Sequence, residues 1–158
     1  MFNTLYLNIR RIDLASRKFV PSAPSAVFAG HRDKMAYMQL ESIEATDFRN
    51  LRGKITCGRG LNIFFGENGH GKTNWLEAIY LLATGRSFKT AQLNETIRFS
   101  EELAIVRGRV RQSEEITRDL QVAIQGRIKS LSINGKRETV QNFIGQIHAV
   151  VFNSDELE

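Results

Sequence analysis

The sequence has few of the residues that build metal centres, disulfides or membrane spans. Among its 158 residues are one cysteine, Cys57, and three histidines, His31, His70 and His148. A single cysteine excludes an internal disulfide and an all-cysteine metal site, and the histidines show no ligand-like spacing. The longest apolar runs, such as Ile79–Ala83, are far too short to cross a bilayer. These absences favour a soluble, cytoplasmic protein.

Basic charge is in excess, but it is unevenly distributed along the chain. Of the net charge of +5, residues 1–34 contribute most, with six basic and two acidic residues; the other residues carry sixteen basic and fifteen acidic groups. The bulk charge of the main part of the chain is therefore nearly neutral and does not by itself predict DNA binding.

The first 34 residues differ in character from the rest. They contain both prolines, Pro21 and Pro24, in the stretch PSAPSAVFAG, and show little hydrophobic periodicity. Three interpretations are open: a flexible leader, an Arg/Ser-rich targeting peptide, or residues upstream of a true start at Met35 or Met38. We favour the third because a domain-like pattern begins abruptly at Met38.

From Met38 onward the pattern predicts an α/β fold that is not a simple series of βαβ units. Alternating and apolar stretches predict strands, a continuous amphipathic-to-buried stretch predicts a helix that Gly85 terminates, and Asn134-Gly135 predicts a hairpin turn. The expected strands are 38–48, 61–65, 103–111, 119–125, 131–135, 136–138 and a buried strand at 147–152; the expected helices are 73–84 and 139–145.

Residues 66–73, GENGHGKT, match the pattern G-x-x-x-x-G-K-[ST]. Glycines let successive N–H groups turn inward toward a phosphate, and the N-terminus of the next helix adds partial positive charge. In this pattern Lys72 bridges the β- and γ-phosphates, and the Thr73 hydroxyl coordinates Mg²⁺. The sequence therefore predicts a nucleoside-triphosphate site. Its candidate residues are Gly66, Glu67, Asn68, Gly69, His70, Gly71, Lys72 and Thr73.

Several arginines and lysines outside this loop are candidates for phosphate contacts. Arg107, Arg109 and Arg111 alternate along one predicted strand, so they share one face of it. That face is either a DNA-contacting stripe or the solvated outer side of an antiparallel sheet. Arg86 and Lys89 follow the helix. Two interpretations are open for them: a contact with nucleotide or DNA, and simple exposure to solvent.

The stretch DFRNL at 47–51, followed by GLNIFFGENGHGKTNWLEAIYLLATGRSFKT at 60–90, resembles the start of the RecF family of SMC/ABC-type P-loop ATPases. The closing VVFNSDEL is also similar to this family. The resemblance covers residues 36–158 and leaves 1–35 as a leader, disordered or artefactual. It implies the N-terminal part of an ATPase head, namely lobe I with an antiparallel β subdomain, apparently truncated, and a nucleotide contact from Arg49.

The resemblance also implies a function. RecF-family proteins are ATP- and Mg²⁺-dependent DNA-binding proteins of replication and recombinational repair. They bind single-stranded and gapped DNA, dimerise on ATP, and act with RecO- and RecR-like proteins in recombinase loading and the SOS response. Two alternatives stay open: a stand-alone P-loop small-molecule kinase, and a module that binds DNA through its arginine stripe without ATP. A small GTPase is excluded because the chain has no base-reading N-K-x-D motif.

The sequence departs from the family at the residues that cleave ATP. It contains no Gly-Gly dipeptide, which a Ser-Gly-Gly signature requires. Its one Asp-Glu pair, Asp155-Glu156, is separated from the apolar residues 149–152 by Asn153 and Ser154. Walker B acids lie directly at a strand end, where they reach the metal. We therefore interpret this pair as part of a loop, and we assign no catalytic residue.

We expect this chain to bind a nucleotide but to hydrolyse ATP at a negligible rate, because phosphoryl transfer needs a held metal and a positioned water as well as a phosphate cradle. The measurement is phosphate release from Mg-ATP. Turnover that depends on Mg²⁺ and disappears in Lys72→Ala would contradict this expectation.

Overall fold

We describe the protein from a computed structural model, which describes residues 5–7 and 38–151. This part of the chain contains eight strands, one long helix and two short helices. In chain order the elements are β1 (Leu5–Leu7), β2 (Gln39–Phe48), β3 (Leu51–Thr56), β4 (Asn62–Phe64), α1 (Lys72–Thr84), the 3-10 helix η1 (Leu93–Thr96), β5 (Leu103–Arg111), β6 (Thr117–Gln125), β7 (Ile128–Ile133), β8 (Lys136–Glu138) and α2 (Val140–Phe143).

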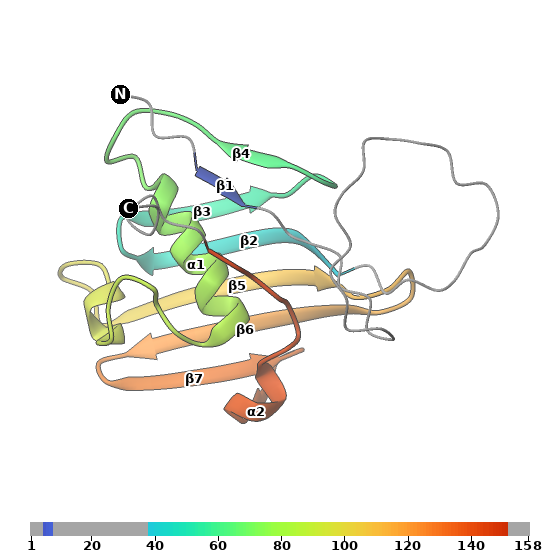
Figure 1. The fold of residues 1–158 in the computed structure, drawn as a ribbon. Coiled ribbons are helices and arrows are strands. Elements are labelled where there is room, and N and C mark those ends of the chain that lie inside the picture. The colour runs from blue at the N-terminus through green and yellow to red at the C-terminus, as the bar shows by residue number, and fades with distance from the viewer. Residues whose placement is uncertain (1–4, 8–37, 152–158) are drawn as a thin grey trace.

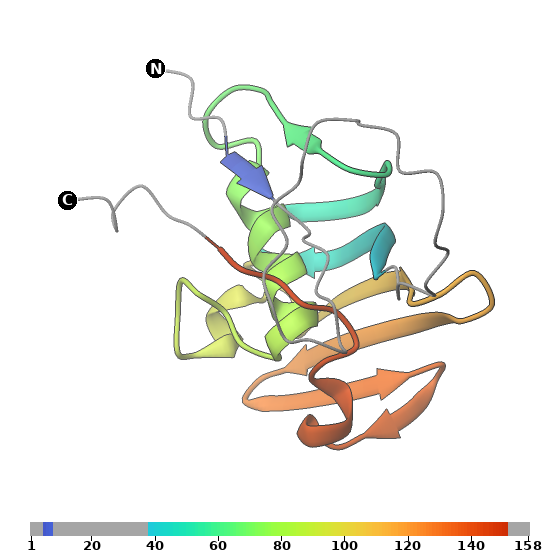
Figure 2. The same ribbon diagram turned by 45° about the vertical axis from the view of Figure 1, so that its right-hand side comes forward.

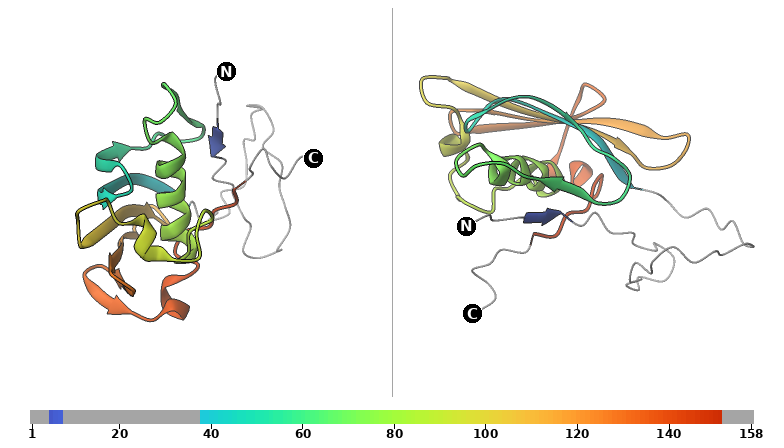
Figure 3. Two further views of the ribbon diagram at one scale, coloured as in Figure 1. Left: turned by 90° about the vertical axis from the view of Figure 1, so that its left-hand side faces the viewer. Right: turned by 90° about the horizontal axis from the view of Figure 1, so that it is seen from above.

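Six of the strands form one antiparallel sheet in the order β3-β2-β5-β6-β7-β8, and β1 pairs with β4 in a second, two-stranded sheet. Helix α1 crosses the inner face of the large sheet (Figures 1 and 2). Seen from above, α1 lies between this sheet and β1, so the fold has layers on both sides of the helix (Figure 3).

Buried apolar residues alternate with more exposed residues along the strands, and the buried ones form the core. On β5, Ala104, Val106 and Val110 are buried, whereas the arginines between them point to the other face. Helix α1 buries residues on most of its circumference, as expected for a helix with a layer on either side. Phe143, at the end of α2, and Ile147, after it, are buried and belong to the same core. In the described part of the chain, no helix is long and apolar enough to span a membrane.

Helix α1 packs closely against the sheet at Gly108 on β5. A Cβ atom at this position would lie 2.6 Å from Leu82 Cδ1 and 3.3 Å from Leu40 Cδ1. Leu82 is fully buried on the helix. The glycine therefore makes room for a leucine of α1, and this contact sets how deeply the helix packs against the sheet.

Most of the expected elements are confirmed. The alternating strands, the Asn134-Gly135 turn and the long helix are present, and Gly85 ends α1 with a left-handed φ of 68°. Helix α1 begins at Lys72, one residue earlier than expected. The hairpin return 136–138 forms β8 as predicted. The division of the chain at residue 35 is not tested by these elements and stays a prediction.

Two expectations about strands are corrected by the structure. The buried strand expected at 147–152 is wrong: residues 147–151 form no strand, Val150 is exposed, and Phe152 lies outside the described residues. Apolar composition alone does not make a strand, because a strand also needs a neighbouring backbone to pair with. Conversely, β3 was not expected. It is an edge strand with exposed residues at positions 52–54, so its apolar pattern is weak.

We predict that Gly108→Ala lowers the free energy of unfolding by about 1–3 kcal/mol, because the added methyl overpacks the Leu82 contact. In a Leu82→Ala background the same substitution should cost much less, since the space is then available. Urea unfolding followed by Trp75 fluorescence gives both values. Additive effects of the two substitutions would contradict the packing account.

Candidate nucleotide-binding site

The loop between β4 and α1 has the backbone that a phosphate cradle requires. Gly66, Gly69 and Gly71 have φ values of 141°, 86° and 87°, which side-chain-bearing residues rarely adopt. A Cβ at Gly66 or Gly69 would meet no atom within 4 Å, so these two glycines serve the backbone conformation alone. At Gly71, a Cβ would also lie 2.7 Å from the Leu51 side chain.

Lys72 is the first residue of α1 and its amine turns back over the loop. Its Nζ donates hydrogen bonds to the carbonyl oxygens of Gly66 and Glu67, both at 2.7 Å. Thr73 follows, exposed, in the first turn of the helix. The loop, the amine and the hydroxyl therefore surround the N-terminus of α1, where the helix dipole favours an anion.

The turn between β2 and β3 braces this loop. Asn50 Nδ2 donates to the Gly69 carbonyl at 3.0 Å, and Asn74 Nδ2 donates to Asn50 Oδ1 at 2.7 Å. Asp47, near the end of β2, and Arg49, in this turn, have left-handed φ values of 52° and 53°. Such a conformation costs about 1–3 kcal/mol for a residue with a side chain and is kept only where its surroundings impose it.

The Arg49 side chain contacts a buried carboxylate on α1, that of Glu77. Arg49 Nε and Nη2 donate to the two oxygens of Glu77 at 3.1 and 2.9 Å, in a bidentate pair. Glu77 is completely buried. Ser87 Oγ donates to the same carboxylate at 2.6 Å, and Lys89 Nζ lies 3.6 Å from it. Arg49 also donates to the Glu95 carbonyl at 2.9 Å.

Lys89 links this carboxylate to the loop-bracing asparagines. Its Nζ donates to Asn74 Oδ1 at 2.6 Å. Burial lowers the pKa of Lys89, and the Glu77 carboxylate opposes that shift. A continuous series of polar contacts thus runs from Gly69 through Asn50, Asn74 and Lys89 to Glu77.

The predicted arginine stripe lies on the outer face of the large sheet, away from the loop. Arg107 and Arg109 are exposed, as the alternation on β5 implies. Each arginine has acidic or polar neighbours. Arg107 donates to Gln121 and lies 4.0 Å from Glu44. Arg109 lies 3.8 Å from both Glu41 and Asp119, and Arg111 pairs with Glu41. Much of the positive charge of this face is therefore balanced locally.

The structure brings together the loop residues expected from sequence and adds others. Glu67 and His70 are exposed, with their side chains 3.6 Å apart. Arg49 lies next to the loop but its guanidinium contacts Glu77. The supporting residues Asn50, Asn74, Glu77 and Ser87 were not expected. Of these four, Glu77 could have been found from the sequence, because a lone carboxylate within the apolar stretch of a buried helix needs a partner. Asp155 and Glu156 lie outside the described residues.

The family model described as an AAA domain matches residues 38–156. The chain belongs to this family of AAA domains. Its similar relatives are DNA replication and repair proteins RecF: 38% identical over 122 residues in Citrifermentans bemidjiense, 39% over 129 residues in Lactobacillus gasseri, and 34% over 125 residues in Caldanaerobacter subterraneus subsp. tengcongensis.

These alignments cover 76–77% of the RecF-like chain and 32–34% of each relative, so the chain spans about a third of their length. A solved structure described as the recombination mediator protein RecF-ATP in the RecFOR pathway matches with a TM-score of 0.63 and 34% identity, covering 70% of this chain and 30% of that one. The expected fold, a P-loop ATPase lobe with an antiparallel β subdomain, is confirmed by this match.

We predict that Glu77→Gln lowers the free energy of unfolding by about 3 kcal/mol, because it leaves the partly buried Arg49 without its carboxylate. The matched control is Glu44→Gln, which removes an exposed carboxylate from the outer face and should cost less than about 1 kcal/mol. Urea unfolding of both variants measures the two changes in the free energy of unfolding. Equal effects would show that the buried pair is no more important than a surface pair.

Proposed function

We propose that this RecF-like chain carries the ATP-binding half-site of a DNA replication and repair ATPase. The observation that supports this most strongly is the loop 66–71, with glycines at left-handed φ and the Lys72 amine directed over it. A matching RecF structure is described as an ATP complex. The glycines, the amine and the helix N-terminus suit a triphosphate in chemistry and in shape.

In this proposal Lys72 would exchange its bonds to the loop carbonyls for a phosphate oxygen of the bound triphosphate. A charged phosphate oxygen accepts a stronger hydrogen bond from an ammonium than a neutral carbonyl does. The backbone N–H groups of residues 68–73 would donate to the phosphates, and the Thr73 hydroxyl would be a ligand for the Mg²⁺ ion that accompanies the nucleotide. Arg49 holds the β2–β3 turn against α1 through Glu77, and a direct nucleotide contact from it stays a proposal.

The wider function is proposed from the relatives. They are named for DNA replication and repair, and the solved protein is described as a recombination mediator of the RecFOR pathway. We infer that this protein binds single-stranded and gapped DNA, dimerises on ATP, acts with RecO- and RecR-like partners, and supports recombinase loading and SOS induction in the cytoplasm. The stripe Arg107, Arg109 and Arg111 is one candidate DNA contact.

A stand-alone small-molecule kinase is the less favoured alternative. It would use Asp155 and Glu156, which lie outside the described residues. The family match and the RecF relatives favour the repair ATPase instead. Adding candidate acceptor molecules with ATP and searching for phosphorylated product separates the two functions.

We predict that Lys72→Ala weakens Mg-ATP binding at least about tenfold, because one charge-assisted hydrogen bond contributes about 1.5–3 kcal/mol. Isothermal titration calorimetry of the whole chain measures the affinity. Lys54→Ala, on the exposed edge strand β3, is the control for loss of a lysine and should bind as the unmodified chain does. Equal affinity of the two variants would remove the support for a nucleotide site at this loop.

A further inference from the structure

The contacts that brace the nucleotide loop begin outside it, at Lys89 in the segment after α1. Ser87 holds the start of this segment against the helix. Its Oγ donates to the buried Glu77 carboxylate at 2.6 Å and accepts from the backbone N–H of Lys89 at 2.9 Å. The segment is therefore placed so that the Lys89 amine reaches Asn74, in the first turn of α1.

The Lys89 amine lies closer to Asn74 than to the carboxylate beside it. Its Nζ donates to Asn74 Oδ1 at 2.6 Å but is 3.6 Å from Glu77. The two oxygens of Glu77 already accept from Arg49 and Ser87. Compensation of the buried charge therefore does not by itself explain where the amine points.

The two ends of this series of contacts fix its direction. An ammonium group can only donate a hydrogen bond and a backbone carbonyl can only accept one, whereas a carboxamide does both. Two carboxamides lie between the Lys89 amine and the Gly69 carbonyl, so each must accept on the lysine side and donate on the loop side. Accordingly, Asn74 accepts from Lys89 and donates to Asn50 Oδ1 at 2.7 Å, and Asn50 Nδ2 donates to Gly69 at 3.0 Å.

This direction sets the orientation of the peptide group between Gly69 and His70. The peptide is trans, so its C=O and N–H point to opposite sides. With the carbonyl held by Asn50, the His70 N–H points across the loop toward the Glu67 carbonyl, at an N–O distance of 3.4 Å. Ordinary N–H···O bonds measure about 2.7–3.2 Å, so this long bond is readily exchanged for one to a phosphate oxygen.

The Asn50 carboxamide is also packed against the start of α1. A Cβ atom at Gly71, the N-cap of the helix, would lie 2.9 Å from Asn50 Oδ1 and 3.3 Å from its Nδ2. The carboxamide is therefore confined by the backbone on one side and by Asn74 and Gly69 through its hydrogen bonds. Its donor can be aimed at the loop only while Asn74 donates to its oxygen.

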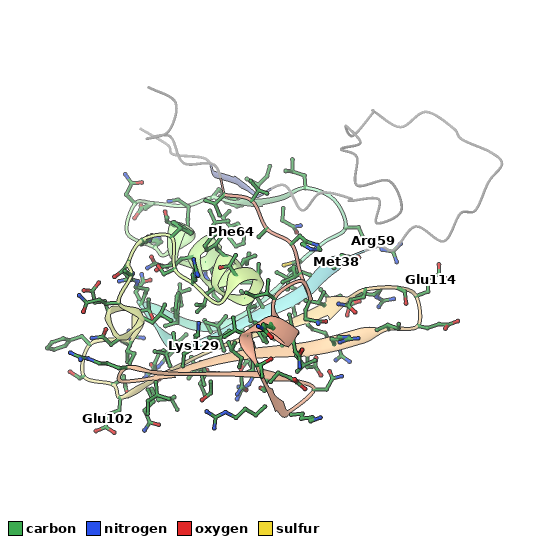
Figure 4. All side chains as sticks on the ribbon, turned by 60° about the horizontal axis from the view of Figure 1, so that its bottom comes forward. Met38, Arg59, Phe64, Glu102, Glu114 and Lys129 are labelled. Carbon is green, nitrogen blue, oxygen red and sulfur yellow. The ribbon has the colours of Figure 1, made fainter. Side chains whose placement is uncertain are left out.

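Another lysine that contacts α1, Lys129, has a simpler arrangement. Figure 4 labels it near the start of β7. Its Nζ donates to the carbonyl of Gly85, the C-cap of α1, at 2.7 Å. A lysine there caps the helix and complements the negative end of the helix dipole. This contact ends at a backbone carbonyl and imposes no direction on other side chains, so Lys129 is a matched control for Lys89.

We propose that Lys89 is a positioning residue for the nucleotide site. Through Asn74 and Asn50, its ammonium group holds the Gly69 carbonyl outward and thereby keeps the His70 N–H directed at the bound phosphates. This inference rests on the proposed ATP-binding function and deepens it, because the shape of the loop then depends on a donor in the segment after α1. Without a donor at position 89, the Asn74 carboxamide is free to turn over, and the bond to Gly69 is no longer imposed.

The experiment is a double-mutant cycle on Mg-ATP affinity, measured by isothermal titration calorimetry of the whole chain. The variants are Lys89→Met, Asn50→Ala and the two combined. We expect each single substitution to weaken binding about three- to tenfold, the effect of one lost hydrogen bond. The combined variant should bind no more weakly than the weaker single variant, because both act through the Gly69 carbonyl. Lys89→Arg keeps a group that only donates and should restore the affinity of the unmodified chain.

An NMR measurement follows the His70 amide without any nucleotide. Isotope-labelled histidine gives backbone amide signals from three residues at most, because the chain has three histidines, and His70→Gln identifies the signal from the loop. We expect this signal to move in Lys89→Met and in Asn50→Ala and to stay in place in Lys89→Arg. Lys129→Met should lower stability in urea but leave both the His70 signal and the ATP affinity unchanged.

Urea unfolding checks that each variant is folded, and Asn74→Leu takes the place of Lys89→Met in the cycle if that variant is not. A lysine that acts on the nucleotide by its charge alone would give additive effects with Asn50→Ala. Additive effects, or an equal loss of affinity in Lys129→Met, would overturn the inference and leave the ATP-binding proposal standing. If the unmodified chain does not bind Mg-ATP, both fail.

Discussion

The bidentate pair between Arg49 and Glu77 is the contact on which the arrangement of the site depends. A fully buried carboxylate is stable only with close compensating charge and hydrogen bonds, and for Glu77 of α1 they come from two other segments, the β2–β3 turn and the segment after α1. Satisfying this one carboxylate fixes the turn against the helix. The same turn then carries Asn50 beneath the loop, so the shape of the phosphate cradle depends on a pair formed outside it.

The strained backbone of the turn is consistent with this role. Arg49 adopts a left-handed φ, and its N–H bonds to the Thr96 carbonyl at 2.6 Å while its side chain faces Glu77. The energy of the buried pair offsets the cost of the conformation. Beyond the turn, Lys89 extends the polar contacts from Glu77 to Asn74, which bonds to Asn50 beneath the loop.

Local signals in the sequence were enough to predict much of this fold. Alternation on β5, the Asn134-Gly135 turn, the helix stop at Gly85 and the motif at 66–73 each act within a few residues, so they are readable without a partner. The contacts that support the site are different, because Arg49 and Glu77 are 28 residues apart and Asn50 and Gly69 are 19 apart. Their pairing is set by how α1 packs on the sheet. Edge strand β3, with its exposed side chains, and the unpaired segment 147–151 were misjudged for the related reason that strand formation depends on neighbours.

The central claim is that the backbone N–H groups at the start of α1 hold a triphosphate. Hydrogen–deuterium exchange of the whole chain, with and without saturating Mg-ATP, tests it most directly. We expect ATP to slow amide exchange in residues 66–73 and to leave exchange in β5 and β6, on the large sheet, unchanged. Exchange in residues 66–73 that is the same with and without ATP would contradict it.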